Sequence, residues 1–256
     1  MKKIILVAFI SFLWFNGFSQ DLPHLNEPVF KPGEVLKYKL KYGFVSAANG
    51  TLKVNKSTLK FDGKPTYHLS AEGKTSSAFS LLFGVHNRYN SYIDQDTFLP
   101  YFYSETIKEG KYRRNDKVRF YQKQRKIKGN EGTFKGASQT FDLLSAYYFA
   151  RNLDLSKIKV GQSFNMTYFL NDEVSTLGIT YLGKERIKTD MGTFNCLKFS
   201  PEIKPGRIFR KDSKLYLWVT DDGNRIPVKA EVEILVGSVT LELTDASGLK
   251  YPLKKN

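Results

Sequence analysis

Residues 214–244, KLYLWVTDDGNRIPVKAEVEILVGSVTLELT, indicate the fold more clearly than any other stretch of the chain. Leu215, Leu217 and Val219 alternate with Tyr and Trp, so both faces are apolar, as in a strand that is covered on both sides. The residues DDGN at 221–224 are typical of a tight turn, because Asp and Asn bond to their own backbone and Gly tolerates positive φ. We therefore expect a buried strand that ends in this turn.

Two further strands follow the turn. Over residues 228–234 apolar residues alternate with charged ones, and the alternation resumes after Gly237 over residues 239–243. Pro227 stands where the first of these strands begins, a position at which a sheet tolerates a missing N–H. The stretch therefore predicts a three-stranded meander with one dry face, which requires an apolar cover.

The same alternation recurs along the rest of the chain. Residues 36–42 alternate between Leu or Tyr and Lys. The chain also contains 15 Tyr and 20 Phe, which favour strands over helices. Asn49-Gly50 and Asp62-Gly63 are expected to form turns, and Gly183 is expected to separate two strands. About a dozen strands are predicted.

One helix is predicted, over about residues 138–152, where apolar residues recur at three- and four-residue spacing. We therefore predict a mainly β fold: a curved antiparallel sheet or a partly open β-barrel with one packed α-helix. Residues 20–256 are expected to form one domain. Two lobes that meet near residues 129–160 are the alternative.

The first 19 residues resemble a signal peptide that is cleaved before Gln20. Lys2-Lys3 is followed by an apolar run over residues 4–15 and by small residues at 17 and 19. The lipoprotein route is not expected, because the chain's one cysteine, Cys196, lies far from this site. We predict a soluble exported protein of the periplasm or of the inner face of the outer membrane.

Net charge narrows the class of partner. The formal charge of +15 attracts phosphate, anionic lipid or acidic glycan. Residues 108–128 contain ten Lys or Arg and two acids, a local charge of +8, with aromatic residues interleaved. This pattern suits nucleic acid in a cytosolic protein. Export favours lipid headgroups, lipopolysaccharide or acidic glycan instead, and a solvated hairpin without a ligand is the structural alternative.

Residues 76–88, SSAFSLLFGVHNR, are densely apolar without clean alternation. We interpret them as a short helix or loop that plugs the end of the sheet. A pocket lining or a contact with a membrane surface is the functional alternative.

Motifs for catalysis or metal binding are not found. His24, His68 and His86 lack partners at metal-ligand spacing, and no nucleotide-binding or nucleophile motif occurs. Asp221 and Asp222 suit a turn better than acid–base chemistry. Catalytic residues, metal ligands and cofactors are therefore not expected.

Short motifs in a fixed order resemble a known family. They are Gly33-Glu34-x-Leu36-x-Tyr38, Arg88-Tyr89-x-Ser91-Tyr92-Ile93-Asp94, Leu99-Pro100, Asp142-x-x-Ser145-x-x-Tyr148-x-x-Arg151, Thr189-x-x-Gly192-x-Phe194-x-Cys196, Leu217-Trp218-x-Thr220-x-Asp222 and Arg225-Ile226-Pro227-Val228. Together they resemble the exported bacterial family called domain of unknown function 3108, over most of residues 30–244. The resemblance implies an envelope location and a mostly antiparallel β fold, and it brings no reaction or cofactor.

A curved sheet with one helix is also similar, at the level of fold only, to the Lol-type lipoprotein carriers. Within the predicted helix, Asp142, Ser145 and Arg151 lie on or near one face. We interpret them as structural residues, with Arg151 as the partner of a carboxylate or of loop carbonyls, rather than as ligand contacts.

We therefore predict a non-enzymatic binding protein for an apolar or anionic envelope molecule. The predicted lining is Phe79, Leu82, Phe83, Tyr147 and Tyr148, and the predicted contacts of an anionic head are Arg113, Arg114 and Arg119. A scaffold or assembly factor in an outer-membrane complex is the first alternative. A glycan hydrolase is the second, and it requires a cleft with two acids about 5–10 Å apart.

Overall fold

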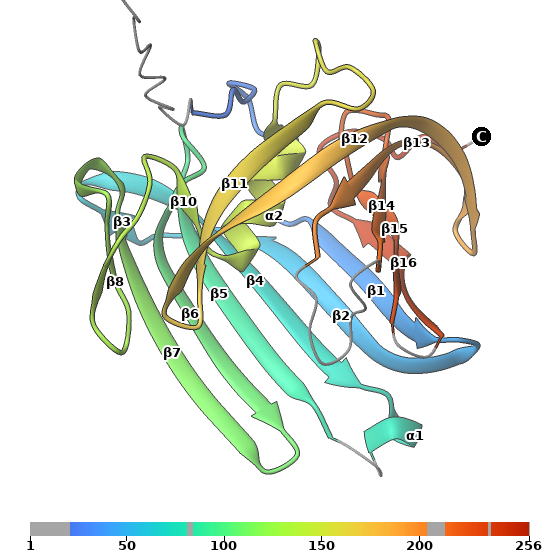
Figure 1. Cartoon of the computed structure of the whole chain (residues 1–256), viewed down its shortest axis with the longest axis horizontal. Coiled ribbons are helices and arrows are strands. Elements are labelled where there is room, and N and C mark those ends of the chain that lie inside the picture. Colours follow the sequence, from blue (N-terminus) through green and yellow to red (C-terminus); the bar gives the residue numbers. More distant parts are fainter. Residues whose placement is uncertain (1–20, 81–83, 204–212, 235–236, 256) are drawn as a thin grey trace, which may run out of the picture.

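Sixteen strands form one curved sheet in the computed structural model, which describes residues 21–80, 84–203, 213–234 and 237–255 (Figure 1). The first part of the chain contributes β1 (Val35–Tyr42), β2 (Val45–Asn55), β3 (Lys60–Phe61), β4 (Lys64–Thr75), β5 (His86–Asp94), β6 (Pro100–Glu109), β7 (Tyr112–Tyr121), β8 (Lys126–Lys128), β9 (Thr133–Lys135) and β10 (Thr140–Phe141). The second part contributes β11 (Ser163–Leu170), β12 (Glu173–Thr189), β13 (Gly192–Pro201), β14 (Leu215–Thr220), β15 (Pro227–Glu233) and β16 (Ser238–Ser247). Short helices are α1 (Ser77–Ser80) and the 3-10 turn η1 (Gln122–Gln124), and the main helix is α2 (Leu143–Asn152).

The strand order explains how the two halves of the chain share one sheet. It runs β10-β11-β12-β13-β14-β15-β16-β1-β2-β4-β5-β6-β7-β8-β9, with β3 attached to β4. Almost every neighbour pair is consecutive in the chain and antiparallel, and β1 joins the halves by pairing with β16, Val35 opposite Ser247 and Tyr42 opposite Val239. The mainly β fold with a curved antiparallel sheet is confirmed, and the stretch 214–244 forms the expected β14, β15 and β16.

The two ends of the sheet meet through side chains rather than through a strand ladder. Phe169 of β11 packs against Phe120 of β7 and Phe134 of β9, with ring centroids 6.4 and 5.1 Å apart. Phe120 and Phe169 are both buried in one cluster with Ile127 of β8. The described sheet is therefore a barrel-like shape whose seam is closed by aromatic packing.

Helix α2 lies between the two walls of the curled sheet (Figure 1). Its buried side packs with aromatic residues from distant segments, among them Phe30, Phe98 and Phe141, in the largest hydrophobic cluster. Each such side chain contributes about 1.5–3 kcal/mol when it leaves water. The cover that the dry face of the sheet requires is therefore this helix together with the segment around Phe30.

The helix begins at Leu143, five residues later than the predicted start at 138. Thr140 and Phe141 instead form a short parallel pair with β11, and Asp142 has an extended backbone. The Asp142 carboxylate accepts hydrogen bonds from the N–H groups of Leu144 and Ser145, at 2.8 and 3.0 Å. The Ser145 hydroxyl lies 2.9 Å from the Asp142 N–H and accepts from it. This reciprocal capping fixes where the helix starts.

Two predicted chain breaks are wrong. Asn49-Gly50 lies inside β2, where Gly50 stands opposite Tyr38, and the β1–β2 turn lies at Gly43. Gly183 lies inside β12, at a register shift after Tyr181. A glycine within a strand can therefore resemble a turn signal in the sequence, and at Gly183 it accompanies a bulge.

Candidate functional site

Two faces of α2 have different neighbours. Leu144, Tyr148 and Phe149 are buried in the cluster with Phe30. The other face, with Leu143, Ala146, Tyr147, Ala150 and Arg151 at three- and four-residue spacing, borders a hollow. The small side chains of Ala146 and Ala150 leave space where larger residues would fill the gap to the opposite wall.

The hollow has a volume of about 240 Å³ and is almost wholly apolar. Its far wall is built from four successive strands, with Phe164 and Met166 of β11, Leu177 and Ile179 of β12, Phe199 and Pro201 of β13, and Leu217 and Val219 of β14. The period-two pattern of these strands places one row of side chains on the face toward α2. Small-molecule sites have this character, apolar walls with a few polar groups at the margin.

Arg151 closes one side of the hollow, but its charge is already satisfied. Its guanidinium binds both carboxylate oxygens of the fully buried Glu34, at 2.6 and 2.9 Å, and donates to the Asn224 carbonyl at 3.0 Å. Burial disfavours the charged form of Arg151, yet the Glu34 carboxylate outweighs burial and raises its pKa. The prediction that Arg151 serves as the partner of a carboxylate and of loop carbonyls agrees with these contacts.

Arg225 is the second cation at the hollow, and its surroundings differ. It is partly buried, and burial lowers its pKa. Its Nη1 donates to the carbonyl oxygens of Leu153 and Arg151. Within the described ranges it makes no ion pair, and its Nη2 and Nε have no protein acceptor. A guanidinium with unused donors beside an apolar hollow is therefore available to an anion.

The turn that carries Arg225 holds it in an uncommon conformation. Arg225 has φ of 51°, in the left-handed region that non-glycine residues rarely adopt. One oxygen of the Asp222 carboxylate accepts from the Thr220 hydroxyl, the Asn224 N–H and the Arg225 N–H, at 2.8, 2.9 and 3.2 Å. Asp222 thus acts as the acceptor that builds the turn, as its sequence setting indicates.

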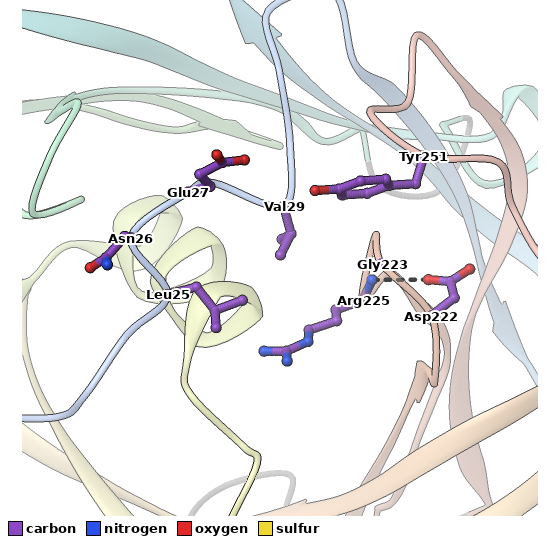
Figure 2. A pocket seen from close by; sticks show the side chains of 8 residues that line it. All are labelled: Leu25, Asn26, Glu27, Val29, Asp222, Gly223, Arg225 and Tyr251. Carbon is purple, nitrogen blue, oxygen red and sulfur yellow. Dashed lines mark hydrogen bonds between the residues drawn. The ribbon is translucent and has the colours of Figure 1, made fainter.

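A second hollow, of about 320 Å³, lies on another side of Arg225 (Figure 2). The Arg225 side chain extends from its turn toward Leu25, and Tyr251 and Glu27 line the same space. The segment around Leu25 is anchored on α2, because the Leu25 N–H donates to the Asn152 carbonyl at 2.8 Å and the Val29 N–H to the Asn152 side chain at 2.8 Å. Arg225 therefore borders both a polar outer hollow and the apolar inner one.

The predicted lining residues are spread over different surroundings. Tyr147 lines the apolar hollow, and Tyr148 is fully buried behind it, 5.0 Å from the Phe30 ring between centroids. Phe79 lies in α1, where its side chain is outside the described structure, and Leu82 and Phe83 lie outside the described residues. Their predicted role in binding stays a prediction.

The three arginines predicted to hold an anionic head do not converge. Arg113 and Arg119 are an even number of residues apart on β7, and Arg114 points to the opposite face, toward Asp116 and Glu105. The Arg119 guanidinium stacks over the Phe61 ring at 4.5 Å. The strand period thus separates residues that are neighbours in the sequence.

Glu105 of β6 and Asp116 of β7 are an acid pair that bears on the glycan-hydrolase hypothesis, because they are direct cross-strand partners. Burial raises the pKa of Glu105, while the Tyr103 hydroxyl donates to it at 2.7 Å. Arg114 lies against both acids. Both carboxylates are thus engaged by neighbouring side chains of the protein, Tyr103 and Arg114. In the described parts of the chain no group of three or more metal-ligating side chains occurs.

Sequence reasoning missed Arg225 and the two alanines as site residues. Arg225 follows a turn and therefore resembles an ordinary surface arginine in the sequence. Ala146 and Ala150 recur at four-residue spacing on the predicted helix, which could have indicated a narrow side of α2.

The family model of DUF3108, described as a protein of unknown function, matches residues 37–244. The chain belongs to the DUF3108 family. Several residues of the family motifs meet at the end of α2. The Arg151 side chain binds Glu34 and the Asn224 carbonyl, and the Arg225 side chain donates to the Arg151 carbonyl. No curated protein matches the sequence.

Three solved structures are similar to this chain at low sequence identity. A β-barrel-like protein with domain of unknown function DUF1849 from Brucella abortus is 11% identical, with a TM-score of 0.56 over 87% of this chain and 99% of that one. A protein from Bacteroides fragilis, described as exported and with a YmcC-like fold, is 10% identical, with a TM-score of 0.41 over 88% and 99%. A hypothetical protein from Chlamydia trachomatis is 9% identical, with a TM-score of 0.39 over 88% and 93%. The first of these supports the barrel-like fold.

Proposed function

We propose that this protein is a non-enzymatic binding protein of the cell envelope, which holds an acyl chain beside α2 and the anionic end of that molecule at Arg225. The observation that carries the proposal is the apolar hollow of about 240 Å³, at whose margin Arg225 has no carboxylate partner among the residues that the structure describes. The leader-like residues 1–19 support export.

The apolar part of the ligand is favoured by the walls of the hollow. Atoms that line an unfilled hollow lack van der Waals partners on one side, so an alkyl chain gains contacts there as it leaves water. The gain is about 25 cal/mol for each Å² of apolar surface removed from water. A volume at the small end of ligand sites suits a single chain rather than a bulky lipid.

The charged part of the ligand is favoured by the geometry at Arg225. Carboxylate and phosphate groups accept two parallel N–H bonds from one guanidinium, and in the described part of the chain Nε and Nη2 of Arg225 have no acceptor. The left-handed backbone costs on the order of 1–3 kcal/mol, and such strain is often retained where it positions a functional side chain. Asp222 and Thr220 hold the turn in that conformation.

The test compares fatty acids of graded length with the purified mature chain. Lipid extraction and native mass spectrometry should detect a bound anionic acyl compound, and palmitate should displace a fluorescent fatty acid. Ala150→Phe fills the hollow and should abolish displacement, whereas Val160→Phe places the same aromatic ring at an exposed site and should not. Arg225→Gln should weaken the binding of palmitate more than the binding of palmityl alcohol, which has no negative charge.

Two outcomes would overturn the proposal. One is undiminished palmitate binding by Ala150→Phe in a variant that is folded by circular dichroism. The other is a protein that carries no lipid and instead crosslinks stoichiometrically to another protein in cells, which would favour the scaffold alternative.

A further inference from the structure

Four turns of neighbouring strand pairs lie at one end of the sheet, remote from α2. Tyr42 is paired with Val239, so the β1–β2 turn lies beside the β15–β16 connection. The β4–β5 connection adjoins the β6–β7 turn, because Val85 bridges Glu109. In Figure 1 the tips of β1–β2 and β6–β7, with α1 between them, follow the lower and right-hand edge of the molecule. We call the described residues 42–45, 74–77 and 108–113 the rim.

The rim exposes large apolar side chains at its tips. Phe44 is completely exposed at the β1–β2 turn, and Tyr42 and Val45 beside it are 41% and 52% exposed. Tyr112, at the β6–β7 turn, is 54% exposed. Aromatic and aliphatic side chains at the ends of protruding turns are typical of proteins that insert shallowly into the boundary of a membrane.

Cations accompany these apolar tips. Lys74, Lys108 and Arg113 border a surface hollow of about 520 Å³, and Lys111 lies at the β6–β7 turn. Within the described part of the chain none of the four forms an ion pair. Glu109 is the acid within the rim, and it accepts a hydrogen bond from the Asn87 amide. Four cations and one acid give the rim a formal net charge of 4 − 1 = +3.

We propose that the rim docks on the surface of a membrane that contains anionic phospholipid. Phe44 and its neighbours would enter the headgroup layer while the cations contact lipid phosphates. Charge complementarity selects this occupant, since basic residues next to a membrane each gain attraction from an anionic leaflet. The inference does not depend on the acyl-binding hollow, which lies beside α2 away from the rim.

Simple adhesion must be separated from docking, because a chain with a net charge of +15 attracts any anionic surface. The matched control is the segment that precedes β11, where Val160 is 70% exposed and Lys157 and Lys159 are exposed. It offers one apolar residue and two lysines at the end of the sheet opposite the rim.

The experiment measures flotation of the mature chain with vesicles of phosphatidylglycerol and phosphatidylcholine, and with phosphatidylcholine alone. Phe44→Ser should weaken binding to the anionic vesicles about tenfold or more, from the lost burial of one aromatic side chain. Joint Lys108→Gln and Lys111→Gln should weaken it about thirtyfold, which corresponds to about 2 kcal/mol for the loss of two lysines beside an anionic leaflet. Val160→Ser, and joint Lys157→Gln and Lys159→Gln, should change it less than twofold.

A fluorophore locates the contact directly. Cys196 is fully buried, so a cysteine introduced by Val45→Cys or Val160→Cys is the residue that reacts. An environment-sensitive dye should shift to the blue on anionic vesicles at position 45 and not at 160. Equal shifts at both positions, equal losses in rim and control variants, or no vesicle binding at all would overturn the proposal. Concentration-dependent dimerisation through Phe44 without vesicle binding would do so as well, and would assign the rim to a second copy.

Discussion

At the scale of single residues, the buried ion pair of Glu34 and Arg151 organises the end of α2. Glu34 precedes β1, Arg151 lies in the last turn of the helix, and the Asn224 carbonyl completes the donors of the guanidinium. A buried pair of this kind is costly to desolvate and is held by good geometry and added hydrogen bonds. Its sequence signature is weak, since a glutamate and an arginine 117 residues apart give no local pattern.

We expect Arg151→Met to lower the free energy of unfolding by about 3–5 kcal/mol, because Glu34 is left charged and buried. Urea denaturation measures the change. The double variant Glu34→Gln with Arg151→Met should recover part of the loss. Lys184→Met removes an exposed pair with Asp221 and should cost less than about 1 kcal/mol. Equal costs for the two single variants would contradict the assigned role of the pair.

At the scale of elements, the start of α2 depends on a buried carboxylate. Asp142 caps the helix and also accepts a hydrogen bond from the Ser91 hydroxyl at 2.6 Å. Burial dominates its surroundings and raises its pKa to about 6. The helix was predictable from its apolar spacing, whereas its first residue was decided by the Asp142 cap together with the pairing of Thr140 and Phe141 with β11.

The raised pKa of Asp142 sets a direction for the effect of pH. A carboxyl whose pKa is higher in the folded protein than in the unfolded one stabilises fully below the unfolded pKa, near 3.8, and loses that contribution as pH rises through about 6. Asp142→Asn removes the titration. The free energy of unfolding of wild type relative to this variant should therefore fall by up to about 3 kcal/mol between pH 4 and pH 7. Urea denaturation over this range measures it, and a constant or rising difference would refute it.

At the scale of the whole molecule, aromatic packing between β7, β9 and β11 closes the curled sheet. Phe169 is 2% exposed at the centre of this seam. Because the described sheet ends at β9 and β10, the seam depends on side chains and not on a hydrogen-bonded ladder. The closed shape of the sheet therefore depends on contacts between segments that lie far apart along the chain.

Removal of the Phe169 ring should open the seam. Phe169→Ala is expected to cost about 3–5 kcal/mol of unfolding free energy and to raise amide hydrogen exchange in β7–β9 and β11 more than in β1 and β16. Phe102→Ala, on a partly exposed aromatic residue of β6, provides the control for loss of a ring. A uniform rise in exchange throughout the sheet would show that the seam is not a separate unit.

Local sequence alone determined the mainly β class, the meander over residues 214–244 and the presence of α2. Period-two alternation, turn chemistry at Asp62-Gly63 and helical spacing act over a few residues and can be seen without a partner. Glycines were ambiguous, because Gly50 and Gly183 lie inside strands and do not end them.

Tertiary structure alone decided the rest of the site. The pairing of β1 with β16, the partner of Arg151, and the hollow between Ala150 and the β11–β14 wall depend on contacts between residues distant in sequence. Such contacts form only when the sheet curls and brings its distant strands together, so no short sequence pattern predicts them. Arg225 became a candidate ligand contact only when its two neighbouring hollows and unused donors were placed in space.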